Sequence, residues 1–119
     1  MKDNNTVNLS AFAGAKISKE VLHNYFTTLV NLFYKILPMK ESGETSLATY
    51  MRSLQAELIG CGNVVEEIHD DGKYLSLISI LQYMIDNPDL ENSEVKRYVF
   101  SAISVCNGMK GKYASGTEE

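Results

Sequence analysis

The sequence has many serines and carboxylates, but the histidines and cysteines that most often serve as catalytic bases or metal ligands are few and widely spaced. The soft metal ligands are Cys61, Cys106, His23 and His69. No two of them lie at the short spacings from which zinc sites draw their ligands. Both cysteines fall on predicted apolar seams, where a free cysteine behaves as a small buried hydrophobe. We therefore expect no metal, no cofactor and no catalytic residues.

A single Glu-x-x-His pattern, Glu66 to His69, invites a comparison with di-iron proteins. Those proteins carry the pattern on two helices and add a glutamate from each of two more. Here it occurs once, and Ile68 rather than Glu66 or His69 belongs to the apolar seam. His23 and His69 could meet if their helices are antiparallel neighbours, but no nucleophile motif accompanies them. An enzyme or metal protein built on Glu66, His69 and His23 is thus the least favoured hypothesis.

Composition indicates one globular domain with no membrane segment. The chain has 119 residues, of which 45% are hydrophobic and 22% charged, which is close to ordinary globular usage. The formal charge of −4 disfavours a broad, non-specific grip on nucleic acid. Two cysteines, a polar N-terminus and the absence of a long apolar run predict a cytoplasmic protein with reduced thiols.

The first helix is predicted over residues 18–37. Ser18 can cap its first turn, and apolar residues follow at helical spacing. Because Pro38 disfavours helical geometry at the residue before it, we expect the helix to end at Leu37.

The second helix is predicted over residues 47–68, with Thr45 or Ser46 as its cap. Its apolar residues recur at alternating steps of four and three, which is a heptad pattern that no strand can use. Gly60 and Gly62 lie within it, each unfavourable in a helix. We favour a continuous helix, with a close helix crossing or a break as the alternatives. The seam consists of Leu47, Met51, Leu54, Leu58, Cys61, Val65 and Ile68.

A turn at Asp70-Asp71-Gly72 separates this helix from a third, predicted over residues 73–86. Only Ser76, Ser79 and Gln82 interrupt its apolar residues from position 74 onward. A helix that is apolar nearly all round is buried on several sides, either at the centre of a domain or against another chain. A buried strand over residues 74–81 is the competing prediction, but the length of the segment favours helix.

The fourth helix is predicted to start at a cap on Asn92 or Ser93 and to end near Tyr113. Its seam repeats the steps of four and three at Val95, Val99, Ala102, Cys106, Met109 and Tyr113. Helices joined by short connections imply antiparallel neighbours. We therefore predict an all-α fold, a four-helix bundle or a closely related antiparallel helical bundle. Residues 18–113 form its single domain, residues 1–17 a flexible arm and residues 114–119 a disordered tail.

The leading functional hypothesis is a non-enzymatic protein-interaction module. Tyrosine and methionine are enriched at interfaces, and the chain has seven and five of them. We expect it to self-associate as a homodimer, or to act as an adaptor, assembly subunit or small inhibitor of a larger partner, of bacterial or phage origin. The predicted contact residues are Tyr74, Leu77, Tyr83, Met84, Tyr98 and Met109.

The alternative is a nucleic-acid-associated regulator. Lys96, Arg97, Lys110 and Lys112 place four cations on the last predicted helix. A helix-turn-helix needs a short recognition helix with long polar side chains. The short third helix is too apolar for that role, so a solvated basic face is the simpler interpretation.

Overall fold

The computed structural model describes residues 18–113, and every regular element within that range is an α-helix. The helical class is therefore confirmed, and the alternative of a strand over residues 74–81 is wrong. Over these residues six helices replace the four that were predicted, because two of the predicted helices are each broken once. The predicted N-terminal arm and C-terminal tail lie outside the described residues. The helices are α1 (Lys19–Tyr34), α2 (Ile36–Glu41), α3 (Leu47–Val64), α4 (Glu66–His69), α5 (Gly72–Asp86) and α6 (Asn92–Lys112).

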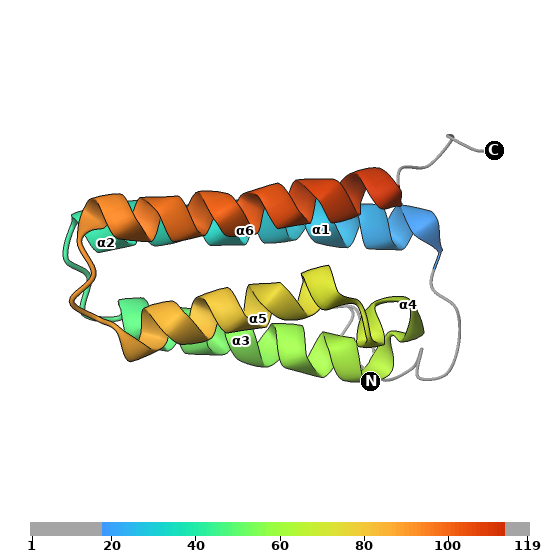
Figure 1. The fold of residues 1–119 in the computed structure, drawn as a ribbon, viewed down its shortest axis with the longest axis horizontal. Coiled ribbons are helices and arrows are strands. Elements are labelled where there is room, and N and C mark those ends of the chain that lie inside the picture. The colour runs from blue at the N-terminus through green and yellow to red at the C-terminus, as the bar shows by residue number, and fades with distance from the viewer. Residues whose placement is uncertain (1–17, 114–119) are drawn as a thin grey trace, which may run out of the picture.

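The first predicted helix breaks at Lys35, and the expected stop at Leu37 is wrong. Pro38 lies inside α2, at its third position. Proline has no N–H to donate to the carbonyl of Tyr34, one turn earlier, and this accounts for the end of α1 at Tyr34. Within the first turn of a helix the missing N–H costs nothing, because that donor has no helical partner. Lys35 keeps helical backbone angles, so α2 continues in the direction of α1 (Figure 1).

The second predicted helix passes through both glycines, as we favoured, but it ends at Val64 rather than at residue 68. Val65 is extended, with φ −100° and ψ 111°, and α4 follows as a single short turn. Val65 and Ile68 are both buried, so the last two side chains of the predicted seam enter the core despite the break. Nδ1 of His69 donates to the carbonyl oxygen of Gly62 at 2.9 Å, which satisfies a carbonyl in the last turn of α3.

α5 begins where the Asp70-Asp71-Gly72 turn was predicted. The Asp71 carboxylate caps it by accepting from the amide of Tyr74 at 3.0 Å. One stripe of the helix faces the core, and Leu75 and Tyr83 on another face are 45% and 44% exposed. The helix is therefore not enclosed at the centre of the domain, and burial of its exposed face against another chain stays a prediction. The buried stripe consists of Tyr74, Leu77, Leu81 and Met84.

The cap of α6 lies one residue earlier than the predicted cap positions. Glu91, not Asn92 or Ser93, occupies the cap position, and the side chain of Glu94 accepts from the Glu91 amide at 3.2 Å. A glutamate three residues into a helix commonly satisfies the cap residue in this way. All six residues of the predicted seam of this helix are buried.

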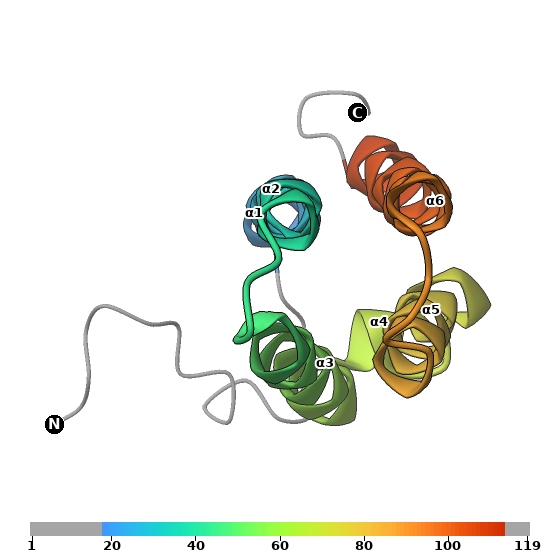
Figure 2. The ribbon, with the colours of Figure 1, turned by 90° about the vertical axis from the view of Figure 1, so that its left-hand side faces the viewer.

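The helices surround one apolar core. α6 packs along α1 on one side and along α5 on the other, and α5 packs along α3. Seen from the end, these four long helices form a ring, with the α2–α3 and α5–α6 connections at the same end of the molecule (Figure 2). Cys61 and Cys106 are buried free thiols in this core. Between residues 18 and 113, no helix combines the length and apolar character needed to cross a membrane.

Candidate protein-interaction surface

Four of the six predicted contact residues belong to the core. Tyr74, Leu77, Met84 and Met109 are at most 2% exposed, so a partner cannot reach them without opening the domain. Their burial contradicts the prediction that they form a contact surface. For the three residues of α5 the reason is that, in a helix that is apolar on most sides, composition does not show which stripe faces inward. Met109 belongs to the predicted seam of α6, and that seam faces the core. Tyr83 and Tyr98 remain as surface residues, the first exposed and the second half-buried.

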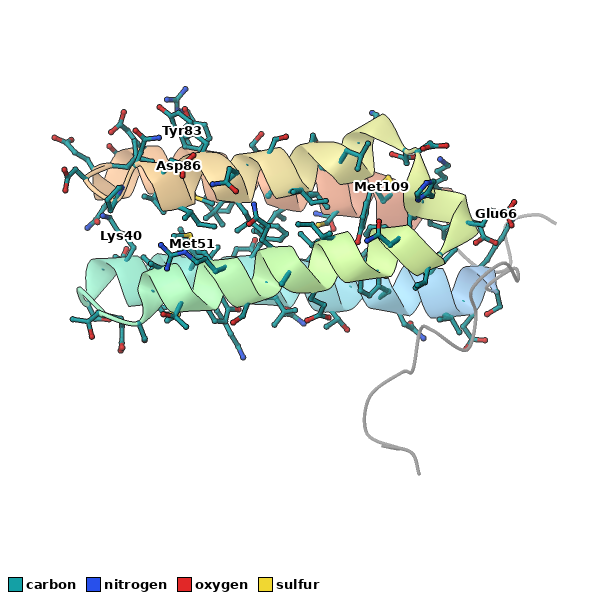
Figure 3. The ribbon with its side chains drawn as sticks, turned by 90° about the horizontal axis from the view of Figure 1, so that it is seen from below. Lys40, Met51, Glu66, Tyr83, Asp86 and Met109 are labelled. Carbon is teal, nitrogen blue, oxygen red and sulfur yellow. The ribbon has the colours of Figure 1, made fainter. Side chains whose placement is uncertain are left out.

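Tyr83 of α5 and Tyr98 of α6 form a pair on the outside of the domain. Their ring centroids are 5.0 Å apart, with the planes inclined by 46°. The guanidinium carbon of Arg97 lies 5.2 Å from the centroid of the Tyr98 ring, within the range of a cation–π contact. Hydrogen bonding to Tyr98 raises the pKa of Tyr83 above its ordinary value of 10.0. Figure 3 shows Tyr83 projecting outward near the end of α5, with Asp86 close by.

A second aromatic pair lies on the opposite flank of α6. The rings of Tyr34, the last residue of α1, and Phe100 meet edge to face with centroids 5.9 Å apart. Their exposed fractions are 43% and 42%. Neither residue was among the predicted contact residues. Each directly follows a core residue, Phe33 or Val99, and so lies about 100° around its helix from that residue.

We call these five side chains, Tyr34, Tyr83, Arg97, Tyr98 and Phe100, the aromatic belt. The belt crosses from α5 over α6 to α1, in the half of the molecule nearest the two connections shown in Figure 1. Tyrosine and arginine are over-represented among the residues that dominate binding energy at protein interfaces. The two ring–ring contacts also hold these side chains in place, which lowers the entropy lost when a partner binds.

The four predicted basic residues do not gather into one patch. Lys96 and Arg97 lie near the start of α6, whereas Lys110 and Lys112 lie at its end, about 20 Å away along the helix axis. The ammonium group of Lys112 forms an ion pair with Asp71 at 3.1 Å. Phosphate binding at this position would have to compete with that carboxylate.

Each histidine is hydrogen-bonded to a backbone carbonyl near the end of a helix. Nδ1 of His23 donates to the carbonyl of Lys110 at 3.2 Å, and His69 bonds to the carbonyl of Gly62. His23 therefore bonds to the last turns of α6, and His69 bonds to the last turn of α3. Over residues 18–113, no group of three His, Cys, Asp or Glu side chains is placed to hold a metal ion, including around Glu66.

The interior holds a polar cluster formed by two tyrosines beside a thiol. The hydroxyl of Tyr74 donates to the carbonyl of Leu58 at 2.6 Å. It therefore accepts from the hydroxyl of Tyr25, 3.2 Å away. Burial raises the pKa of Tyr25, Tyr74 and Cys61, so all three stay protonated. Because a thiol reacts as its thiolate, the protonated Cys61 is a poor nucleophile. The hydrogen bonds of the two tyrosines link α1, α3 and α5.

No protein-family model, curated protein or solved structure matches this chain. A function has therefore to be inferred from the chemistry of its own residues.

Proposed function

We propose that the protein is a non-enzymatic interaction module that associates with a second copy of itself through the aromatic belt. The observation that carries this proposal is the belt itself: Tyr34, Tyr83 and Phe100 are each more than two-fifths exposed and lie around one end of one helix. Leaving large aromatic surface in water is unfavourable, and its burial against a partner would recover that free energy.

The charges of Arg97 in the belt and Glu94 beside it favour a second copy as the partner. Glu94 and Arg97 both lie close enough to Tyr83 to shift its pKa, in opposite directions. A two-fold symmetric interface brings the same patch of both copies together, so a patch that carries both signs of charge can complement itself. A uniformly charged patch would instead repel its copy.

The interior chemistry supports a non-enzymatic role. The thiols are buried and protonated, and both histidines are bonded to backbone carbonyls. The free thiols also support the cytoplasmic location that we propose. For the fold, we propose a relative of the antiparallel four-helix bundle in which α1 with α2, and α3 with α4, each form one broken helix.

Two other functions give different results in solution. An adaptor or inhibitor of a larger partner would leave the isolated chain monomeric at every concentration. A nucleic-acid regulator would bind DNA with an affinity that falls steeply with salt. We do not favour the regulator, because Lys112 is paired with Asp71 and the other cations are divided between the two ends of α6.

Sedimentation equilibrium of the full chain over a wide concentration range tests the proposal. We expect a reversible dimer, weakened at least about tenfold by Phe100→Ser or Arg97→Glu, as removal of a central contact typically does. Leu75→Ser is the matched control, because Leu75 is as exposed as Phe100 but lies outside the belt. A chain that stays monomeric throughout, or a dimer weakened equally by Leu75→Ser, would overturn the proposal.

A further inference from the structure

A cavity of about 260 Å³ opens at the end of the molecule that carries the two connections. It lies where the α2–α3 turn, the last turn of α5 and the first turn of α6 come together. Figure 3 shows Lys40 and Met51 near each other in this region. No residue of the aromatic belt lines the cavity, so it is a separate feature. Its apolar lining consists of Met39, Leu47, Ala48, Met51, Met84, Ile85, Pro88 and Val95.

The walls of the cavity suit a small apolar molecule. Met51, Met84 and Val95 are core residues, at most 5% exposed, so the inner wall of the cavity is part of the packed core. Three of the lining residues are methionines, whose flexible and polarisable side chains adapt to differently shaped ligands. An apolar protein cavity of about 150 Å³ is known to hold benzene, so this cavity has room for about ten non-hydrogen atoms. That volume is too small for a partner's helix.

The rim of the cavity has two charges of opposite sign. Nζ of Lys40 donates to the carbonyl oxygen of Pro88 at 3.3 Å and so ties the end of α2 to the α5–α6 connection. An ammonium group has three protons, so Lys40 keeps donors for a further acceptor. Glu44 lines the same cavity. Its carboxylate balances Lys40, and this balance disfavours a ligand with a net charge.

We propose that this cavity binds a small, uncharged, apolar molecule of about ten non-hydrogen atoms that carries one oxygen able to accept a hydrogen bond from Lys40. The apolar body lies against the three methionines, and the oxygen lies at the rim. Binding of this kind is independent of self-association, because the cavity and the aromatic belt share no residue.

The methionine methyl groups give a direct test with octanol as the probe. In full-length chain labelled with carbon-13 at the methionine methyls, octanol should produce saturable shifts of Met39, Met51 and Met84. Met109, buried near the other end of the core, is the internal control and should not shift. Equal shifts at Met109, or no shift up to the solubility limit of octanol, would overturn the proposal.

Three variants separate binding in the cavity from adsorption elsewhere. Ala48→Trp fills the cavity and should abolish the saturable shifts, whereas Ala56→Trp places the same side chain on an exposed position of the same helix and should not. Lys40→Met keeps the apolar walls and should weaken octanol binding about tenfold, the usual effect of losing one hydrogen bond to a charged donor. Saturable binding that persists unchanged in Ala48→Trp and in Lys40→Met would contradict the assignment.

Discussion

Gly62 of α3 lies directly against the ring of Tyr74 of α5: a Cβ atom at position 62 would be 3.1 Å from Cε2 of that ring. This is tighter than ordinary van der Waals contact between carbon atoms. The ring cannot easily retreat, because its hydroxyl is bonded to Leu58 and its edge meets Phe26. The close helix crossing that was one alternative for the glycine pair is therefore present at Gly62, and Gly60 plays no part in it.

The two glycines should consequently respond in opposite ways to alanine. Gly60 is exposed, and a Cβ atom added there would have no neighbour within 4 Å, so Gly60→Ala should raise the free energy of unfolding by up to about 1 kcal/mol through helix propensity. Gly62→Ala should lower it by about 1–3 kcal/mol, the usual cost of overpacking a core. Urea unfolding of both variants measures the difference. A stabilised Gly62→Ala would show that Tyr74 moves freely.

Removing the Tyr74 hydroxyl should destabilise the domain through the buried polar cluster. Tyr74→Phe deletes the donor to Leu58 and leaves the Tyr25 hydroxyl without its acceptor, at a cost of about 1–3 kcal/mol. Tyr34→Phe, at an exposed position, should change the stability of the monomer by less than about 0.5 kcal/mol. Chemical denaturation checks both. If Tyr25→Phe and Tyr74→Phe prove strictly additive, the two hydroxyls do not interact as described.

Raising the pH above 9 should lower the free energy of unfolding more than the titration of exposed groups alone would. Burial raises the pKa of the Cys106 thiol to about 12 from an ordinary value of 9.0. Above pH 9 the unfolded chain loses this proton while the native one retains it, so stability falls as pH rises, by up to about 1.4 kcal/mol per pH unit. Cys106→Ala should lower stability at neutral pH but flatten this slope. Parallel pH profiles for the two proteins would contradict the prediction.

Asp71 should make α5 sensitive to acid. Burial acts to raise the pKa of this carboxyl, but hydrogen bonds from the Tyr74 amide and Lys112 outweigh it and hold the pKa below the ordinary 3.8. Stability gained from the ionised carboxylate is therefore present above pH 4 and lost as pH falls through the lowered pKa. Asp71→Ala should cost about 1–2 kcal/mol near pH 7, as loss of a helix cap does. Lys112→Met should cost less than about 1 kcal/mol, because Lys112 is more than half exposed. Thermal unfolding at several pH values measures whether Asp71→Ala costs more stability than Lys112→Met.

Seam positions were predictable from the sequence, whereas helix ends and the contact surface were not. Steps of three and four at Met51, Leu54 and Leu58 fix one inward face, and the structure buries all three. The break at Val65 could not be predicted from the seam, because Val65 and Ile68 are buried with the break just as the seam predicts without it. Pro38 was misread because a proline is tolerated in the first turn of a new helix as well as after an old one.

The contact surface could not be predicted because it, too, depends on tertiary packing. On α5, Tyr74 and Tyr83 are both large and amphipathic, and only the packing of α3 and α6 decides which of them is enclosed. Tyr34 and Phe100 were visible in the sequence as aromatic residues next to seam positions. Their pairing across α1 and α6 is a tertiary contact that periodicity within one helix does not reveal.

A dilution series of nitrogen-15 amide spectra on the full chain tests self-association through the aromatic belt most directly. As the concentration rises, amide shifts should move at Tyr34, Tyr83 and residues 97–100, and stay fixed at the exposed Ile59 and Leu75. Spectra that do not change over the whole series, or changes centred on Ile59 and Leu75, would contradict the proposed interface.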